Sequence, residues 1–401
     1  MPRINAARRA SREVRPGVET LDARLVLSLV APAPKVATSL PSDPDLARQW
    51  GLNDPADVDI NAPEAWRATT GSASTIVAVL DSGVDAANPE FRNRLWVNPA
   101  ASGRGKPAYG WNFVGNNADV RDDYGHGTHV AGIIGAARDG KGIVGVDWNA
   151  RLMILKVLDS RGGGDPAVAA AAVRFAADNG ARVISVSWAL DVYSQDLYDA
   201  IAHAGSRGAV VVVSAGNQGV NGDLRPVYPA SFDLPNILVV AAVDRSGALA
   251  SFSNYGAGTV DVAAPGVDVY STFPSRSRYA TLSGTSMAVP HVAGVVSLVV
   301  ARHPDWSAER IVEHVKATVK PVAALAGVTS SGGIVDAAKA VGAPTSNPAP
   351  PIYPTATPPP RRGMVVAREV RPRPLRPAPA PALAARTIPA FQPRGVRMAR
   401  A

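Results

Sequence analysis

The stretch Gly284-Thr285-Ser286-Met287-Ala288-Val289-Pro290-His291-Val292-Ala293-Gly294 decides the interpretation of the whole chain. Its serine follows a glycine at the head of an apolar segment with helical spacing. The first turn of a helix has N–H groups without intrahelical partners and a partial positive charge, which suits an oxyanion. Pro290 would fall within roughly the first turn, where its missing N–H costs least. Alone, however, Gly-Thr-Ser is also an ordinary turn and helix N-cap.

Upstream of this segment, apolar runs rich in valine and isoleucine alternate with helix-like segments. We expect buried strands at 75–80, 152–158, 183–187, 209–214 and 237–243. We expect helices at 129–137, 165–179, 195–206, 287–301 and 308–317. Continuously apolar strands with helices between them indicate an α/β domain of three layers, α/β/α, with a mostly parallel central sheet. Active sites in such sheets form at the carboxyl ends of the strands.

Two further stretches hold side chains suited to proton transfer. Asp81 ends the first strongly apolar run, so its carboxylate would stand at the rim of the sheet, although an aspartate there can equally cap a turn. His126 lies between two glycines at the start of a helical segment, which leaves room around its imidazole. His126 and His129, three apart on a helix, could also bind a metal, but the His-Glu-x-x-His pattern is absent.

Together, Asp81, His126 and Ser286 supply what acyl transfer needs: a carboxylate, a base near neutrality and a weak nucleophile. Their order along the chain is one of three known for this geometry. The region 43–343 resembles the subtilisin-like serine proteases (subtilases, peptidase family S8). Three motifs carry the resemblance, namely Asp81-Ser82-Gly83-Val84-Asp85, His126-Gly127-Thr128-His129-Val130-Ala131-Gly132 and Gly284-Thr285-Ser286-Met287-Ala288-Val289-Pro290-His291.

The resemblance implies a serine endopeptidase that acts through an acyl-enzyme. Ser286 would be the nucleophile, His126 the base and Asp81 the residue that orients the base. In the family, an asparagine at the place of Asn217 donates its side-chain amide to the oxyanion, beside the N–H of Ser286.

The resemblance also implies the residues that bind an extended peptide substrate as an added strand. These lie in two edge segments, 161–164 and 187–189, and include Gly162, Gly163, Ser187, Trp188 and Ala189. The pocket for the residue before the cut would be completed by Ser214, Ala215 and Gly216. Many relatives have glycine where Ala189 stands, so we expect a narrowed pocket that accepts large aromatic residues poorly.

Structural calcium is the cofactor that the resemblance suggests, and none is required for the chemistry. Residues 137–146 match the calcium loop of the family, with Glu90 and Asp139 at ligand positions. Carboxylates and backbone carbonyls are the hard oxygen ligands that calcium prefers. Lys141 adds a positive charge to this loop, which opposes binding.

The net charge of +8 is concentrated at the two ends of the chain. Residues 344–401 hold ten arginines and one acidic residue, Glu369, while residues 1–48 hold eight basic and five acidic groups. The segment 344–401 is rich in proline, alanine and arginine, so we expect a disordered tail. Its charge could hold an anionic surface, although a solvated tail is the simpler interpretation. Nucleic acid is not expected, because interleaved aromatic residues are missing.

Residues 1–42 are expected to form a basic leader that is disordered or removed. Its arginines precede a short apolar run at 25–30, which resembles an export signal, although such runs are usually longer. No stretch approaches the ~18 apolar residues of a membrane span. The absence of cysteine excludes disulfides and a cysteine nucleophile. We expect a monomeric bacterial enzyme, secreted or held in the cell envelope, with polypeptide substrates.

Two other functions stay open. An esterase or lipase would use the same chemistry, but Ser286 does not lie in a Gly-x-Ser-x-Gly elbow, and the order of the three residues differs from Ser, Asp, His. A non-catalytic binding protein on the same fold is the second alternative. The presence of all four expected catalytic residues argues against it.

Overall fold

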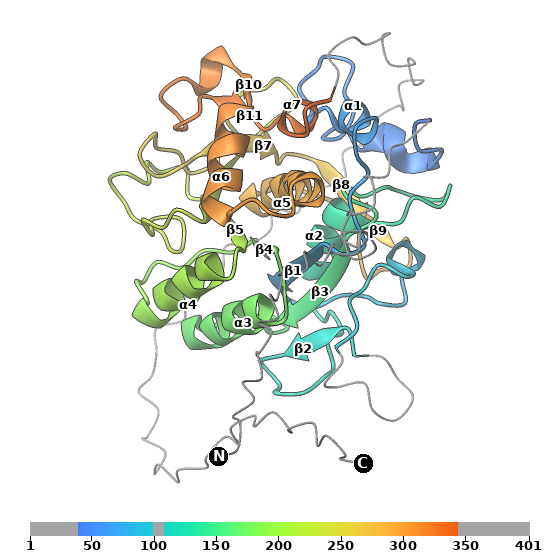
Figure 1. Ribbon diagram of the computed structural model, residues 1–401, viewed down its shortest axis with the longest axis vertical. Helices are drawn as coiled ribbons and strands as arrows, with labels where there is room; N and C mark the ends of the chain where they lie inside the picture. Colours follow the sequence, from blue (N-terminus) through green and yellow to red (C-terminus); the bar gives the residue numbers. More distant parts are fainter. Residues whose placement is uncertain (1–38, 99–107, 344–401) are drawn as a thin grey trace, which may run out of the picture.

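The computed structural model describes residues 39–98 and 108–343, so most of the predicted leader and the whole predicted tail lie outside the described residues. A nine-stranded sheet runs through this region in the order β10-β11-β7-β6-β5-β4-β1-β3-β2 (Figure 1). Neighbouring strands are parallel except for β10 and β11, which are antiparallel. The predicted mostly parallel sheet is therefore confirmed.

The strands vary widely in length, and the long ones lie in the middle of the sheet. From edge to edge they are β10 (Lys320–Pro321), β11 (Gly333–Ile334), β7 (Val262–Pro265), β6 (Ile237–Val243), β5 (Val210–Ser214), β4 (Val183–Val186), β1 (Ile76–Asp81), β3 (Arg151–Lys156) and β2 (Gly110–Asn112). A separate antiparallel hairpin is formed by β8 (Val269–Thr272) and β9 (Tyr279–Leu282). The central strands are buried along their whole length, as their continuous apolar sequences predict.

Helices cover both faces of the sheet and complete the three layers. The long helices are α2 (His126–Gly135), α3 (Pro166–Asp178), α4 (Gln195–Ser206), α5 (Thr285–Arg302) and α6 (Ala308–Ala317). Shorter ones are α1 (Ala62–Trp66), α7 (Ala337–Ala340) and the 3-10 helices η1 (Pro44–Arg48), η2 (Pro89–Phe91) and η3 (Ala323–Leu325). The pair α3 and α4 packs on one face, and α2 and α5 pack on the other (Figure 1). The predicted three-layer fold is thus confirmed.

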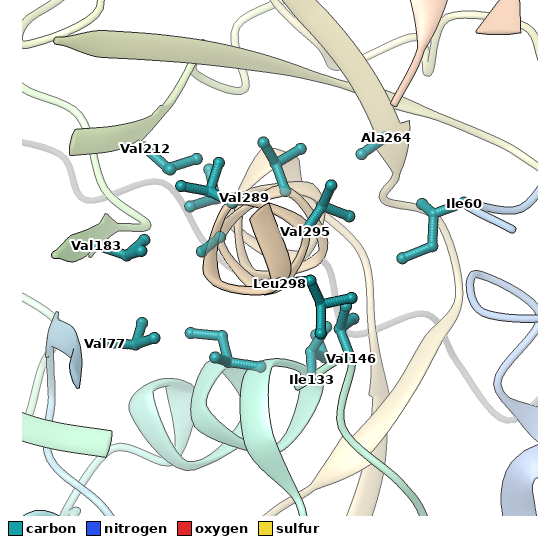
Figure 2. Packing of buried hydrophobic residues seen from close by; sticks show 14 of the residues in the cluster. Ile60, Val77, Ile133, Val146, Val183, Val212, Ala264, Val289, Val295 and Leu298 are labelled. Carbon is teal, nitrogen blue, oxygen red and sulfur yellow. The ribbon is translucent and has the colours of Figure 1, made fainter. Parts of the chain in front are cut away.

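Helix α5 lies at the centre of the larger core. Val77, Val183 and Val212, from three adjacent strands, point toward it, and α2 packs beside it (Figure 2). Among the described residues, α5 is the one helix that is long and apolar enough, by length and composition alone, to span a bilayer. Because 89% of this window is buried inside the protein, its apolar character reflects the core.

The structure corrects the boundaries of two predicted helices. Helix α2 begins at His126, three residues before the predicted start, because the side chain of Asp122 accepts a hydrogen bond from the N–H of Thr128 and caps the first turn. Helix α5 begins at Thr285, so Pro290 is its sixth residue and lies beyond the first turn. The proline therefore leaves a carbonyl of the first turn without its usual helical partner.

The parallel register brings the carboxyl ends of the central strands to one edge of the sheet. Asp81 ends β1 opposite Lys156, the last residue of β3. Ser214 ends β5, and Ser187 directly follows β4. Side chains that lie more than 100 residues apart in the sequence therefore meet at this edge.

Helix α5 approaches Val146 so closely that there is no room for a side chain at Gly294. A Cβ atom at this glycine would lie 2.4 Å from the Cβ of Val146. Replacing a helical glycine by alanine ordinarily stabilises by about 1 kcal/mol. Here we expect Gly294→Ala to destabilise by about 1–3 kcal/mol, because the helix must move away from the core. Thermal unfolding in a Ser286→Ala background, which prevents the expected self-digestion, measures this. An unchanged or higher melting temperature would contradict the packing.

Candidate active site

A buried carboxylate–imidazole pair lies at the edge where β1 ends. Nδ1 of His126, the first residue of α2, is 2.8 Å from Oδ1 of Asp81 and 3.0 Å from its Oδ2. The exposed fraction is 1% for Asp81 and 7% for His126. The backbone N–H of Ser82 donates a further hydrogen bond of 2.7 Å to Oδ1 of Asp81. These contacts leave Nε2 as the nitrogen of His126 that can act on a third group.

The surroundings of His126 favour its protonated form. Burial lowers the pKa of the imidazole, but the charge and hydrogen bond of Asp81 and the charge of Asp122 outweigh burial, so the pKa is raised. An imidazole held in this way can accept a proton and stabilise the positive charge that results. Neighbouring His129 differs, because burial lowers its pKa to about 3 and keeps it neutral.

Ser286 is the second residue of α5, directly after Gly284 at the N-cap and Thr285. The residue is 7% exposed, and its hydroxyl donates a 2.8 Å hydrogen bond to the carbonyl oxygen of Ser187. Its backbone N–H belongs to the first turn of the helix, where donors have no intrahelical acceptor. The serine therefore combines a hydroxyl near the sheet edge with a free backbone donor.

A second donor faces the same place from the end of β5. Oδ1 of Asn217 accepts hydrogen bonds from the N–H and the hydroxyl of Thr285, both at 2.9 Å. With Oδ1 held, the amide NH₂ of Asn217 is left as a donor. A Cβ built on Gly284 would lie 3.6 Å from that nitrogen and 3.7 Å from the backbone nitrogen of Ser286. The two donors thus flank the same small space.

Thr285 was missed from the sequence as a site residue. Thr285 directly precedes the expected nucleophile, but the local sequence Gly-Thr-Ser indicates only the N-cap of a helix. Its contact with Asn217 spans 68 residues and depends on how β5 and α5 meet, so no local pattern indicates it.

The predicted peptide-binding segments border a cavity next to Ser187. It is lined by Val157, Leu158, Gly162, Gly164, Asp165, Ala169, Trp188, Ala189 and Leu190. Gly163 lies in the same turn and donates its N–H to Asp159 at 2.9 Å. Trp188 is anchored by a 2.9 Å hydrogen bond from its indole to the carbonyl of Leu80. Both predicted edge segments therefore contribute to one hollow.

The third predicted segment, Ser214 to Gly216, is tied to the wall of this hollow. The hydroxyl of Ser214 donates to the carbonyl of Trp188 at 3.1 Å. Asn254 donates its side-chain amide to the carbonyl of Ala215 and its N–H to that of Gly216. The first bond joins the two segments, and the other two fix Ala215 and Gly216 against Asn254.

The two predicted calcium ligands lie apart from this edge, near the loop 137–146. Oε1 of Glu90 accepts hydrogen bonds from the N–H of Ile143 and the hydroxyl of Tyr279, while its buried Oε2 has no partner. Burial raises the pKa of Glu90 to about 7, and the charges of Asp139 and Asp43 add to this rise. A nearby cation would stabilise the charged form of this carboxylate.

Asp43, the N-cap residue of η1, is a third carboxylate that contacts this loop, and the sequence did not reveal it. Its Oδ1 accepts the N–H groups of Asp139 and Gly140 at 3.1 and 3.0 Å, and its Oδ2 is buried without a partner. Burial also raises the pKa of Asp43. Within residues 39–98 and 108–343, no three acidic, histidine or cysteine side chains are assembled as a ready metal cluster. The unpartnered oxygens of Asp43 and Glu90 are of the kind that a hard cation prefers.

Comparison with known proteins gives consistent matches. The family model described as "Subtilase family" matches residues 72–342. The chain is 40% identical over 264 residues to thermitase of Thermoactinomyces vulgaris, covering 65% of this chain and 86% of that protein. It is 43% identical over 239 residues to the thermophilic serine proteinase of Bacillus sp. strain AK1, covering 59% of this chain but only 55% of that protein.

A solved structure is also similar. A protease from Pseudoalteromonas arctica PAMC 21717 matches with a TM-score of 0.66 and 31% identity, covering 76% of this chain and 99% of that structure.

The Asp81–His126 contact predicts a change in the titration of His126. Asp81→Asn removes the charge that raises the pKa of the imidazole, so the midpoint of the His126 NMR titration should fall to lower pH. The His126 signal can be assigned by its loss in His126→Gln. Asp178→Asn is the matched control, because Asp178 is an exposed carboxylate that pairs with a different histidine, His203, and its loss should leave the His126 midpoint unchanged. An unmoved His126 midpoint in Asp81→Asn would contradict the geometry.

Proposed function

Since the chain belongs to the subtilase family and is a serine-type endopeptidase, we propose that it is exported and cleaves extended polypeptides through an acyl-enzyme on Ser286. The observation that carries the proposal is the buried contact between Asp81 and His126 at the edge of the sheet, together with Ser286 as the second residue of α5. The three side chains come from three separate elements and converge on one edge of the sheet. That arrangement suits acyl transfer to a serine hydroxyl.

In the proposed first step, Oγ of Ser286 attacks the carbonyl carbon of the scissile peptide bond. The hydroxyl turns from the carbonyl of Ser187 toward His126, and its proton passes to Nε2. Asp81 holds the imidazole through Nδ1 and stabilises the positive charge that develops, consistent with the raised pKa of His126. The protonated imidazole then gives this proton to the leaving amine, and the peptide bond breaks.

The carbonyl oxygen becomes negatively charged during the attack. We assign its stabilisation to the amide of Asn217 and the backbone N–H of Ser286, the two donors that flank the space beside Gly284. Both are fixed before the substrate arrives, because Thr285 holds the amide and the helix holds the N–H. Donors that need no rearrangement during the reaction contribute most to lowering its barrier.

Hydrolysis of the acyl-enzyme repeats the step with water. His126 takes a proton from a water molecule, which attacks the ester carbon of acylated Ser286. The same two donors hold the oxyanion, and the proton then returns to Oγ of Ser286. The enzyme regains its starting state without any external reactant other than water.

The substrate is proposed to lie as an added strand between 161–164 and 187–189. These segments border one cavity, and backbone pairing along them favours an extended peptide with little dependence on its sequence. The methyl group of Ala189 narrows the pocket for the residue before the cut, which disfavours large aromatic side chains there. The arginine-rich segment before residues 25–30 supports export, and the basic residues of 344–401 suit an anionic surface of the cell envelope.

Cleavage of unfolded casein tests the proposed roles. Ser286→Ala should abolish it, since loss of this nucleophile in a subtilisin, a relative, costs about 10⁶-fold in rate. Asn217→Ala should lower it by about 10²–10³-fold, the loss measured in a subtilisin for the corresponding donor. Ser283→Ala is the matched control, because this nearby serine hydroxyl contacts the backbone of Asp268 and should leave cleavage intact. Full activity of Ser286→Ala would exclude the mechanism.

We also propose that calcium binds between η1, η2 and the loop 137–146, held by Asp43, Glu90 and Asp139. The unpartnered oxygens of Asp43 and Glu90 support this site. Bound calcium would neutralise carboxylates that burial otherwise destabilises in their charged form. Its role would be structural, since the loop is separate from the edge that bears Ser286.

Calcium should therefore raise the melting temperature, and a chelator should reverse the rise, because a ligand that binds only the folded state stabilises it. In Glu90→Gln the response should shrink strongly or vanish. Asp178→Asn, which removes an exposed carboxylate elsewhere, should respond like the wild type. A wild-type melting temperature that neither calcium nor a chelator changes would rule out the site.

A further inference from the structure

Asp122 makes an unusually dense set of contacts just before α2. Its Oδ1 accepts hydrogen bonds from the hydroxyl of Ser82 at 2.8 Å and from the N–H groups of Tyr124 and Gly125 at 3.1 and 2.7 Å. Its Oδ2 accepts the N–H and the hydroxyl of Thr128 at 2.8 and 2.5 Å. One carboxylate thus binds the turn that leads into α2, the first turn of that helix, and Ser82, the residue that follows β1.

Ser82 completes the connection between the two elements. Its hydroxyl donates to Asp122 and accepts the N–H of Gly127 at 2.9 Å, while its own N–H donates to Oδ1 of Asp81. Asp81 and Ser82 are neighbours at the end of β1, and Gly127 follows His126. Asp122 is therefore connected to both members of the Asp81–His126 pair through one residue, Ser82.

The charge of Asp122 is maintained in this position. Burial raises its pKa, but the hydrogen bonds from Thr128, Gly125 and Ser82 outweigh burial and hold the pKa below its usual value. The carboxylate therefore stays ionised at neutral pH, and its charge contributes to the raised pKa of His126.

Other titratable groups around His126 must be considered beside it. They are Asp81 of β1, Asp122 and Tyr124 of the preceding turn, His129 of α2 and Lys156 of β3. Nζ of buried Lys156 donates to the carbonyls of Ser82 and Leu158 and to Asp123, so its positive charge is already engaged at this edge. His129 is neutral, which leaves the two carboxylates as the negative groups that act on the imidazole.

We propose that Asp122 is a positioning residue for the reaction, which holds His126 against Asp81 by tying the start of α2 to the end of β1 through Ser82. This inference rests on the catalytic roles proposed above. Asp122 itself touches no reacting atom. Its position matters because proton transfer depends strongly on geometry: a shift of about 1 Å in a catalytic group can cost about 10²-fold in rate.

Asp122→Asn keeps the size of the side chain but removes the charge and one acceptor oxygen. We expect kcat on a peptide substrate to fall by about 10–100-fold, with KM changed by less than about 3-fold, because substrate contacts are untouched. Losing a negative charge lowers the pKa of His126, so the acidic limb of the pH profile of kcat/KM should move to lower pH. Asp119→Asn is the matched control, since Asp119 forms an exposed ion pair with Arg121 and should change neither value.

Ser82→Ala tests the positioning role of Asp122 separately from the effect of its charge. It breaks the connection but keeps the carboxylate, so kcat should fall while the acidic limb stays near the wild-type pH. It also carries the test if Asp122→Asn does not fold. Wild-type kcat and an unmoved acidic limb in a folded Asp122→Asn, or a wild-type kcat in Ser82→Ala, would overturn the inference. An inactive wild-type enzyme would instead refute the proposed function, so the two failures are distinguishable.

Discussion

Parallel pairing of the central strands is the constraint on which the rest of the structure depends. Because β1, β4 and β5 run in the same direction, the residues that end them leave the sheet at one edge. Helices that return over a parallel sheet begin at that same edge, so the N-termini of α2 and α5 lie there too. Backbone topology therefore accounts for the contact of His126 with Asp81 and for the contact of Ser286 with Ser187, the residue that follows β4.

Burial at this edge also strengthens these contacts. The nearly complete burial of Asp81 and His126 strengthens their interaction, since charges attract more strongly away from water. The same burial would be costly for unpaired groups, and the hydrogen bonds that Asp81 and Asp122 accept and that Lys156 donates offset that cost. The edge is thus a connected polar network set in an apolar core, rather than a set of independent side chains.

The sequence predicts the fold correctly and points to three candidate site residues, because both leave local patterns. Continuous valine-rich runs predict the buried strands, and three short motifs predict the positions of Asp81, His126 and Ser286. Asp43, Asp122 and Thr285 could not be found in this way. Their contacts with Gly140, Ser82 and Asn217 cross from 40 to 97 residues of sequence and exist only after loops have docked. The early start of α2 was missed for a different reason: the capping residue, Asp122, lies only six residues before Thr128, but it was not recognised from the sequence as a cap.

Covalent labelling with a fluorophosphonate tests most directly whether Ser286, activated by His126, is the nucleophile. The reagent reacts with serines made nucleophilic by an adjacent base, and peptide mapping by mass spectrometry locates the adduct. We predict a single adduct on Ser286 that forms on the folded protein, disappears on unfolding, and forms far more slowly in His126→Gln. An adduct on a different serine, or none on folded protein that still cleaves casein, would contradict the account.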